Sequence, residues 1–321
     1  MWKYFCKKTI QLMIVMILIS FFSFAIIYFA PGDISMMYIS QDMTEEQKAS
    51  VMAELGLDKS MLEQYIAWAG RAVHGDLGVS LANKASVLPQ IAKRLPSTIL
   101  LMGCSFLLSL ILAIPLGLWS GYHKNTWIDN LISSVTYMGM SIPSFWFGML
   151  LIILFSGIFH ILPSSGMHTV GDNSVLDTVK HMIMPCITLS MGNLAVYIRY
   201  IRANTIGQLS EEYVLTAEAK GTSKGKILRN HVLKNTLLPI ITLVGMNLAS
   251  LVCGSFIIES VFGWPGIGSF AMEAIGKRDY PIIMAYVMMS GLILVIGNFI
   301  ADILYAIADP RIKRGGTESG T

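Results

Sequence analysis

Long apolar segments alternate with polar ones along the whole 321-residue chain. A helix needs roughly 20 apolar residues to cross a hydrocarbon core about 30 Å thick. Six segments meet this requirement: about 9–30, 97–121, 129–160, 181–199, 238–258 and 282–304. The third is long enough either to be tilted or to be a span followed by an interfacial turn. Because lipid offers no hydrogen bonds to the backbone, the segments predict an all-α membrane protein with six transmembrane helices.

The composition agrees with a membrane protein. Hydrophobic residues make up 54% of the chain and charged residues 13%, whereas about a quarter of an ordinary soluble domain is charged. The first apolar run, 9–30, is longer than the core of a signal peptide, and no small-residue cleavage site follows it. We therefore expect it to be a retained transmembrane helix.

Positive charges gather at four flanks of the predicted spans, and such flanks stay in the cytoplasm. The flanks lie before span 1, after span 2, between spans 4 and 5, and after span 6. Their charged residues include Lys7, Lys8, Lys124, Arg199, Arg202, Lys220, Lys226, Arg229, Arg311 and Arg314. With six spans, all four flanks fall on one side, so both termini are expected to be cytoplasmic.

The polar segment 31–95 falls on the opposite, outer side. Thr44 with two following glutamates predicts the start of one helix, and residues 57–73 have apolar positions at helical spacing that predict a second. We expect a small outer cap, not a separate domain. The chain then divides into 1–96 (first helix and outer insertion), 97–306 (five-helix core) and 307–321 (cytoplasmic tail).

Residues 203–237, called the polar loop below, interrupt the apolar core with a charged, helix-forming sequence. Ser210 is a candidate N-cap for a helix in EEYVLTAEAK, Gly221 a helix stop, and Thr222 and Ser223 caps for a second helix. One interpretation is a solvated, positively charged linker. The other is a docking site, because small residues at a helix–break–helix corner let a partner approach the backbone closely.

Recognisable catalytic motifs are missing, and so are ion-coupling ones. The chain contains no HExxH, G-x-S-x-G or GxxxxGK[ST] sequence, and Asp129 and Asp302 lie at span ends. Coupled carriers usually need carboxylates near the middle of the membrane. We expect a transport protein that is not an enzyme, has no cofactor of its own, and receives energy from a partner.

The sequence AKGTSKGKILRNHVLKNTLLP, which follows EYVLTAEA, resembles the cytoplasmic EAA loop of ATP-binding-cassette (ABC) importer permeases. In those families an alanine, three residues and a glycine form the corner of a coupling helix that docks on the ATPase. The resemblance implies ATPase contacts for six residues of the corner: Ala217, Glu218, Lys220, Gly221, Thr222 and Ser223.

Two departures from the general motif favour one branch of these permeases. Leu215 stands where the motif places a glutamate, and Pro239 comes five residues after the expected terminal proline position, near Lys234. Both departures resemble the dipeptide, oligopeptide and nickel branch. Eight further stretches resemble that branch in the same order: FAPGD, HGDLGVSL, RLPSTIL, IPSFWFG, LPSSG, IIESVFGWPGIG, KRDYPII and IADPRIK.

The resemblance implies a six-helix permease of the type I ABC importer fold in the bacterial cytoplasmic membrane. Its implied partners are a second homologous permease in a heterodimer, two cytoplasmic ATPases that bind the ATP, an external substrate-binding protein and the lipid bilayer, with no nucleic acid. The implied mechanism is alternating access. The substrates of the branch are peptides, nickel or metal chelates, and residues 245–268 lean slightly toward the nickel-type members.

Two motifs are candidates for the outer gate or the substrate path. Phe145 and Trp146 in the third span either pack around a proline kink or contact substrate. Trp264, Pro265 and Gly266 form either a structural turn or a gate between spans 5 and 6. Three histidines near the outer span ends (His160, His168 and His181) have no ligand spacing, so no metal site is expected.

Two functions of other classes compete with the permease interpretation. A stand-alone ion-coupled carrier or channel would work without ATPase partners, and an intramembrane enzyme would turn over substrate alone. The missing midplane carboxylates count against the first. The missing catalytic motifs count against the second.

Overall fold

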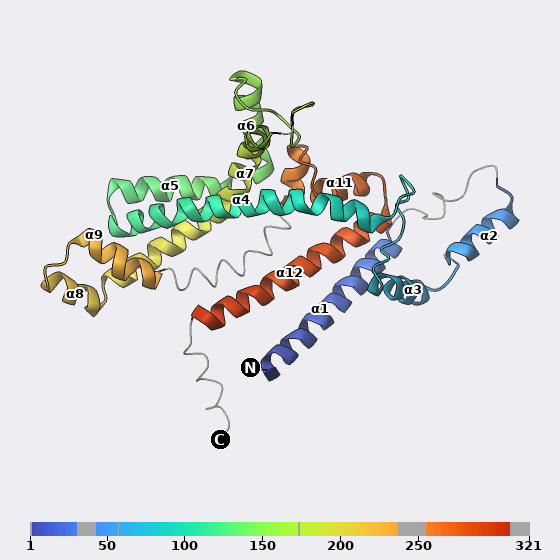
Figure 1. The fold of residues 1–321 in the computed structure, drawn as a ribbon, viewed down its shortest axis with the longest axis horizontal. Coiled ribbons are helices and arrows are strands. Elements are labelled where there is room, and N and C mark those ends of the chain that lie inside the picture. Colours follow the sequence, from blue (N-terminus) through green and yellow to red (C-terminus); the bar gives the residue numbers. More distant parts are fainter. Residues whose placement is uncertain (1, 31–42, 57, 173, 237–254, 309–321) are drawn as a thin grey trace. The chain divides into compact units, whose positions relative to one another are not determined.

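The computed structural model describes residues 2–30, 43–56, 58–172, 174–236 and 255–308. Within these ranges regular structure is helical, apart from an isolated bridge between Val79 and Ser86. By length and composition four helices of the described residues are able to cross a membrane. They are α1 (Trp2–Tyr28), α4 (Val87–Tyr122), α7 (Val175–Leu209) and α12 (Tyr280–Ala308) (Figure 1). The predicted span 238–258 lies outside the described residues except for its last four, and so does the tail after 308.

The third predicted span is a broken helix. Helix α5 (Trp127–Ser141) ends at Ile142, and the chain continues at 103° as α6 (Ser144–Leu151) and the π-helical turn η2 (Ile152–Ile158) (Figure 1). Pro143 causes the break, because it has no N–H and forces the preceding residue into an extended conformation. The single tilted helix is therefore wrong, and the described residues have at most five spans if the bent pair counts as one.

The contacts divide the chain into two units, one of residues 1–96 and 270–292, the other of 97–269 and 293–321. In the first unit the polar insertion contains the two predicted helices, α2 (Glu45–Leu55) and α3 (Met61–Val73). Thr44 is the N-cap of α2 as predicted, and it forms a capping box with Gln47. The local sequence therefore determined where this helix starts.

Helix α3 packs on α1 through aromatic rings. Tyr65 meets Phe21 and Phe24 edge-on, at centroid distances of 5.3 and 5.7 Å. Its hydroxyl also shares a 2.9 Å hydrogen bond with Ser20. Aromatic pairs of this geometry contribute beyond the area that they bury. The insertion is thus anchored on the first transmembrane helix.

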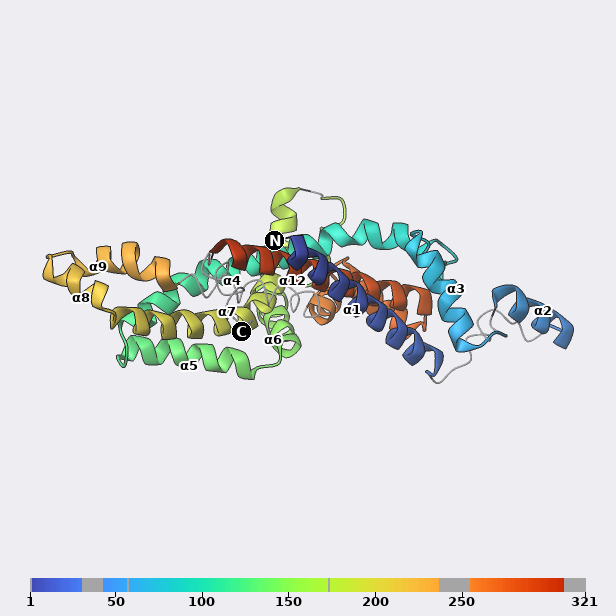
Figure 2. The ribbon, with the colours of Figure 1, turned by 90° about the horizontal axis from the view of Figure 1, so that it is seen from below.

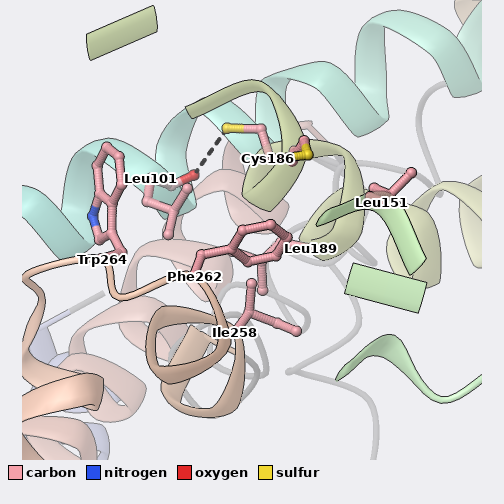
Figure 3. Close-up of a cluster of buried hydrophobic side chains, with 8 residues drawn as sticks. Leu101, Leu151, Cys186, Leu189, Ile258, Phe262 and Trp264 are labelled. Carbon is pink, nitrogen blue, oxygen red and sulfur yellow. Dashed lines mark hydrogen bonds between the residues drawn. The ribbon is translucent and has the colours of Figure 1, made fainter. Parts of the chain in front are cut away.

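The core of the second unit joins α4, α6, α7 and helical residues 255–261. Eight buried side chains form it: Leu101, Leu151, Met184, Cys186, Leu189, Ile258, Phe262 and Trp264 (Figure 3). Cys186 also points its thiol at the Leu101 carbonyl, 3.8 Å away. Elsewhere in this unit α5 lies along α7 (Figure 2). The polar loop follows from the end of α7.

Candidate functional site

The polar loop is two helical segments around a glycine corner, as the sequence predicted. Helix α8 (Glu212–Ala219) is followed by α9 (Lys224–Ile227), which continues through the π-helical turn η3 (Leu228–Val232). Gly221 has φ +76°, a conformation that glycine adopts without strain. The Thr222 amide donates to the Ala217 carbonyl and the Gly221 amide to that of Glu218. These two bonds are a Schellman motif, which ends α8 sharply.

Both segments share a small apolar core. Its buried side chains are Val214, Ala217, Ile227 and Val232, and Leu209 at the end of α7 packs against them. Because of this core the corner has a defined shape without any partner. Ala217 therefore points into the loop itself, and its small side chain lets α8 and α9 approach each other.

Most of the predicted contact residues lie on the solvent-exposed face of the corner. Glu218, Lys220, Gly221 and Ser223 are exposed, and Thr222 is half-buried. Leu215 of α8 is also exposed, with 60% of its area open. The sequence marked this leucine only as a departure from a motif, whereas its exposure makes it a candidate contact residue.

One predicted cap is misplaced, and another is in place but makes no capping bond. Ser210 ends α7, and the N-cap of α8 is Glu211, whose side chain makes no capping bond. Ser223 does occupy the N-cap of α9, but its hydroxyl accepts no capping bond either. The prediction for Ser210 is wrong because α7 runs on to Leu209, and this extends the helix into the polar loop.

A second structured turn lies between residues 259 and 269, and it is called the α11 turn because it leads into α11 (Ile267–Gly276). Glu259 is fully buried in it. One carboxylate oxygen accepts the Thr98 hydroxyl at 2.8 Å, and the other accepts the amides of Gly268 and Ser269 at 2.7 and 3.1 Å. A carboxylate at the first amides of a helix also interacts favourably with the helix dipole. Glu259 thus fixes the start of α11 to α4.

Two glycines of the α11 turn leave room for this carboxylate. A Cβ atom on Gly266 would overlap the Glu259 Oε2 atom, and one on Gly268 would lie 2.6 Å from the Phe256 Cα atom. Trp264 is also buried, with its indole N–H donating to the Ser97 carbonyl at 2.9 Å. Of the predicted gate residues here, only Pro265 is exposed.

The five candidate pathway residues do not form one site. Trp264 belongs to the buried core of the second unit (Figure 3), while Phe145 and Trp146 lie exposed on the first turn of α6 and are not part of that core. The α11 turn therefore has a structural explanation in the Glu259 hydrogen bonds. The two α6 aromatics have no described partner that would explain them by packing.

Two of the three histidines predicted at the outer span ends lie around a carboxylate. The Nδ1 atoms of His168 and His181 lie 4.0 and 3.6 Å from an Asp177 oxygen, which also accepts the Thr169 amide. His160 is elsewhere, bonded to its own helix. Among the described residues no three His, Cys, Asp or Glu side chains are placed to hold a metal ion.

Comparison with known proteins decides the family. Residues 113–314 match the family described as "Binding-protein-dependent transport system inner membrane component", and residues 1–102 match the corresponding N-terminal family. The chain belongs to this family of importer permeases. It is a multi-pass inner-membrane protein and a permease subunit of an ABC importer. It is not an enzyme, since separate subunits hydrolyse the ATP.

Two curated relatives match the permease over nearly its whole length. It is 36% identical to the oligopeptide transport system permease protein AppB of Bacillus subtilis over 97% of this chain and 99% of the relative. It is 31% identical to the dipeptide transport system permease protein DppB of Escherichia coli over 92% and 94%. The membrane fold also resembles that of the MetNI methionine ABC transporter in an inward-facing conformation, with a TM-score of 0.51 at 16% identity over 67% of this chain and 95% of that chain.

Proposed function

We propose that this permease forms half of the translocation path of an ATP-driven peptide importer. The observation that carries the proposal is the exposed corner of the polar loop, with Leu215 and Gly221 on a segment that has its own core. ATPase and binding-protein partners follow from the family, and the names of the relatives favour peptides over nickel or metal chelates. The second half of the path is a homologous permease in a heterodimer.

The proposed mechanism uses the corner as the docking surface for an ATPase. ATP binding closes the two ATPases and draws the polar loops of both permeases together. Because α8 and α9 share a core with Leu209, the loop and the end of α7 move as one body. The permeases then swing between inward- and outward-facing conformations, and the chain itself binds no nucleotide. Both termini and the polar loop are cytoplasmic.

Reconstitution tests the function and the substrate class together. The complete complex, with its binding protein, is placed in vesicles and supplied with labelled dipeptide, labelled oligopeptide or nickel. We expect ATP-dependent, vanadate-sensitive uptake of peptide. Uptake of nickel alone would overturn the peptide assignment, and uptake that persists without the ATPases would favour a stand-alone carrier instead.

Leu215 provides the test of the docking surface. Its side chain is exposed, so Leu215→Asp leaves the loop core intact while placing a charge where an apolar contact is proposed. We expect recovery of ATPases with the permease to fall about tenfold, as is typical for the loss of a central interface residue. Val170→Asp is the matched control, because Val170 is a fully exposed apolar residue in a loop before α7. Equal recovery for both variants would remove Leu215 from the interface.

A further inference from the structure

The carboxylate of Asp129 is the centre of a buried polar node at the start of α5. Asp129 is a charged residue in the first turn of the apolar helix α5, and only 1% of its surface is exposed. Arg202 of α7 binds it through two nitrogens, with its Nε 2.6 Å from Oδ1 and its Nη2 2.7 Å from Oδ2. The Ser120 hydroxyl of α4 and the Asn125 amide of the connecting turn complete the node at 2.5 and 2.9 Å. A single side chain therefore binds α4, the α4–α5 turn and α7.

Close backbone packing surrounds the node. A Cβ atom on Gly117 of α4 would lie 2.6 Å from the Ile201 Cβ, and one on Gly121 would lie 2.7 Å from the Thr205 Cβ. Glycines spaced four apart let membrane helices approach in this way. One turn earlier, Ala113 is buried with Tyr197, Ile198 and Ile201. Helices α4 and α7 are thus in direct backbone contact on both sides of Arg202.

The node lies directly before the polar loop along the chain. From Arg202 the helix α7 continues to Leu209, which packs in the loop core with Val214 and Ala217. A displacement of the loop therefore reaches Arg202 through continuous helix. The two-pronged arginine–carboxylate bond fixes orientation as well as distance, which a single point charge does not.

We propose that the Asp129–Arg202 pair transmits the movement of the polar loop to the α4–α5 hairpin. Both are positioning residues, since neither touches ATP or substrate. Without the bond, α7 moves with the ATPase while the hairpin lags behind it, so ATP is hydrolysed with less transport. The proposal rests on the proposed function, in which the loop receives the force.

The test separates transmission from assembly. Complexes carrying Arg202→Gln, Asp129→Asn or Arg202→Lys are purified with their ATPases and reconstituted, and both peptide uptake and ATP hydrolysis are measured. The matched control is Arg199→Gln, because Arg199 lies on the same helix one turn earlier, is exposed, and makes no ion pair among the described residues. We expect Arg202→Gln and Asp129→Asn to retain the ATPases and to transport about tenfold less peptide per ATP, within the range of typical coupling energies.

The possible results have distinct meanings. Arg202→Lys keeps the charge but not the two-pronged geometry, so an intermediate uptake per ATP supports the transmission role. Uptake and hydrolysis that fall in the same proportion in every variant would make the pair merely structural, and so would loss of ATPases from both Arg202 variants. A ratio equal to that of Arg199→Gln would overturn the role as well. If the unmodified complex shows no ATP-dependent uptake, the proposed function fails instead.

Discussion

The polar loop and the α11 turn both contain glycines between helices, but for opposite physical reasons. Gly221 has φ +76°, and a Cβ atom added there would meet no atom within 4 Å, so its backbone requires glycine while its surroundings are open. Gly266 has no left-handed backbone, and a Cβ there would collide with the Glu259 carboxylate. One glycine is needed for a conformation and the other for space.

This difference distinguishes the corner of the polar loop, which is a surface open to a partner, from the α11 turn, which is an internal packing contact. Around Gly221 added volume points outward, so a substitution changes what another protein meets. Around Gly266 added volume must displace the carboxylate that holds the start of α11. We therefore expect substitutions in the α11 turn to affect the folding of the permease, and bulky or charged ones at the corner of the polar loop to affect its assembly.

The largest effect is expected for Gly266→Ala. A Cβ atom on residue 266 would overlap the Glu259 carboxylate and the Thr98 hydroxyl. Hydrogen bonds hold both groups in place, so we expect this overpacking to lower the free energy of unfolding by about 3 kcal/mol. The midpoint of thermal unfolding in detergent measures it. Gly276→Ala, at the end of the same helix, is the control, because a Cβ there meets nothing within 4 Å. Equal midpoints for the two variants would contradict the space argument.

A smaller loss is expected for Glu259→Gln. The amide keeps one oxygen for the Gly268 and Ser269 N–H groups, but its NH2 group then faces Thr98, whose hydroxyl already accepts the Ile267 amide at 2.8 Å. Loss of charge-assisted hydrogen bonds costs about 2 kcal/mol in such sites. Glu273→Gln on α11 is the control, since Glu273 is exposed and its ion pair with Lys277 is exposed as well. A Glu259→Gln midpoint no lower than that of Glu273→Gln would rule out the capping role.

The sequence predicts what local chemistry decides. The Thr44 N-cap and the Gly221 stop each depend on a few adjacent residues. Resemblance to the permease family added the docking role of the polar loop, which residue patterns alone left open between linker and interface. The wrong cap at Ser210 shows the limit of local patterns, because serine also suits a helix start, whereas here α7 runs to Leu209 and Ser210 is its C-cap.

The polar contacts that organise the second unit were not predictable in this way. Glu259 bonds Thr98, 161 residues away, and Arg202 bonds Asp129, 73 residues away. In the sequence Arg202 counts as one of several positive charges at a flank predicted to be cytoplasmic, and no local spacing distinguishes it from Arg199. Only the approach of α4 to α7, which Gly117 and Gly121 permit, brings it to a buried carboxylate.

A third prediction concerns the corner of the polar loop. Gly221→Ala retains open surroundings but forces alanine into a left-handed conformation, at a cost of about 1 kcal/mol. Gly221→Asn is the control for backbone strain, because asparagine tolerates this conformation. Both variants are expected to reach the membrane and recover their ATPases. Gly221→Arg should also reach the membrane but lose its ATPases, since its side chain points from the exposed corner. Recovery of ATPases and transport by Gly221→Arg would refute docking at this corner.

The smallest change in stability is expected at Glu63, a carboxylate that caps a helix start as Glu259 does but is exposed to solvent. Glu63 caps the start of α3 with Ser60, accepting both the Ser60 hydroxyl at 2.7 Å and its amide at 2.9 Å. The hydrogen bonds from the Ser60 hydroxyl and then its amide hold the pKa of Glu63 below its ordinary value. Unlike Glu259, this carboxylate is in solvent, so water replaces most of what a substitution removes.

The sign of the Glu63 effect follows from that lowered pKa. The charged cap stabilises the fold above the pKa of the unfolded chain, and its contribution is lost as the pH falls through the lower pKa of the folded state. Glu63→Gln keeps a capping box but does not titrate. We therefore expect the unfolding midpoint of the unmodified permease to exceed that of the variant slightly at about pH 7, and the difference to vanish by about pH 3. A difference that grows on acidification would contradict the lowered pKa. An effect as large as that of Glu259→Gln would contradict the distinction between exposed and buried caps.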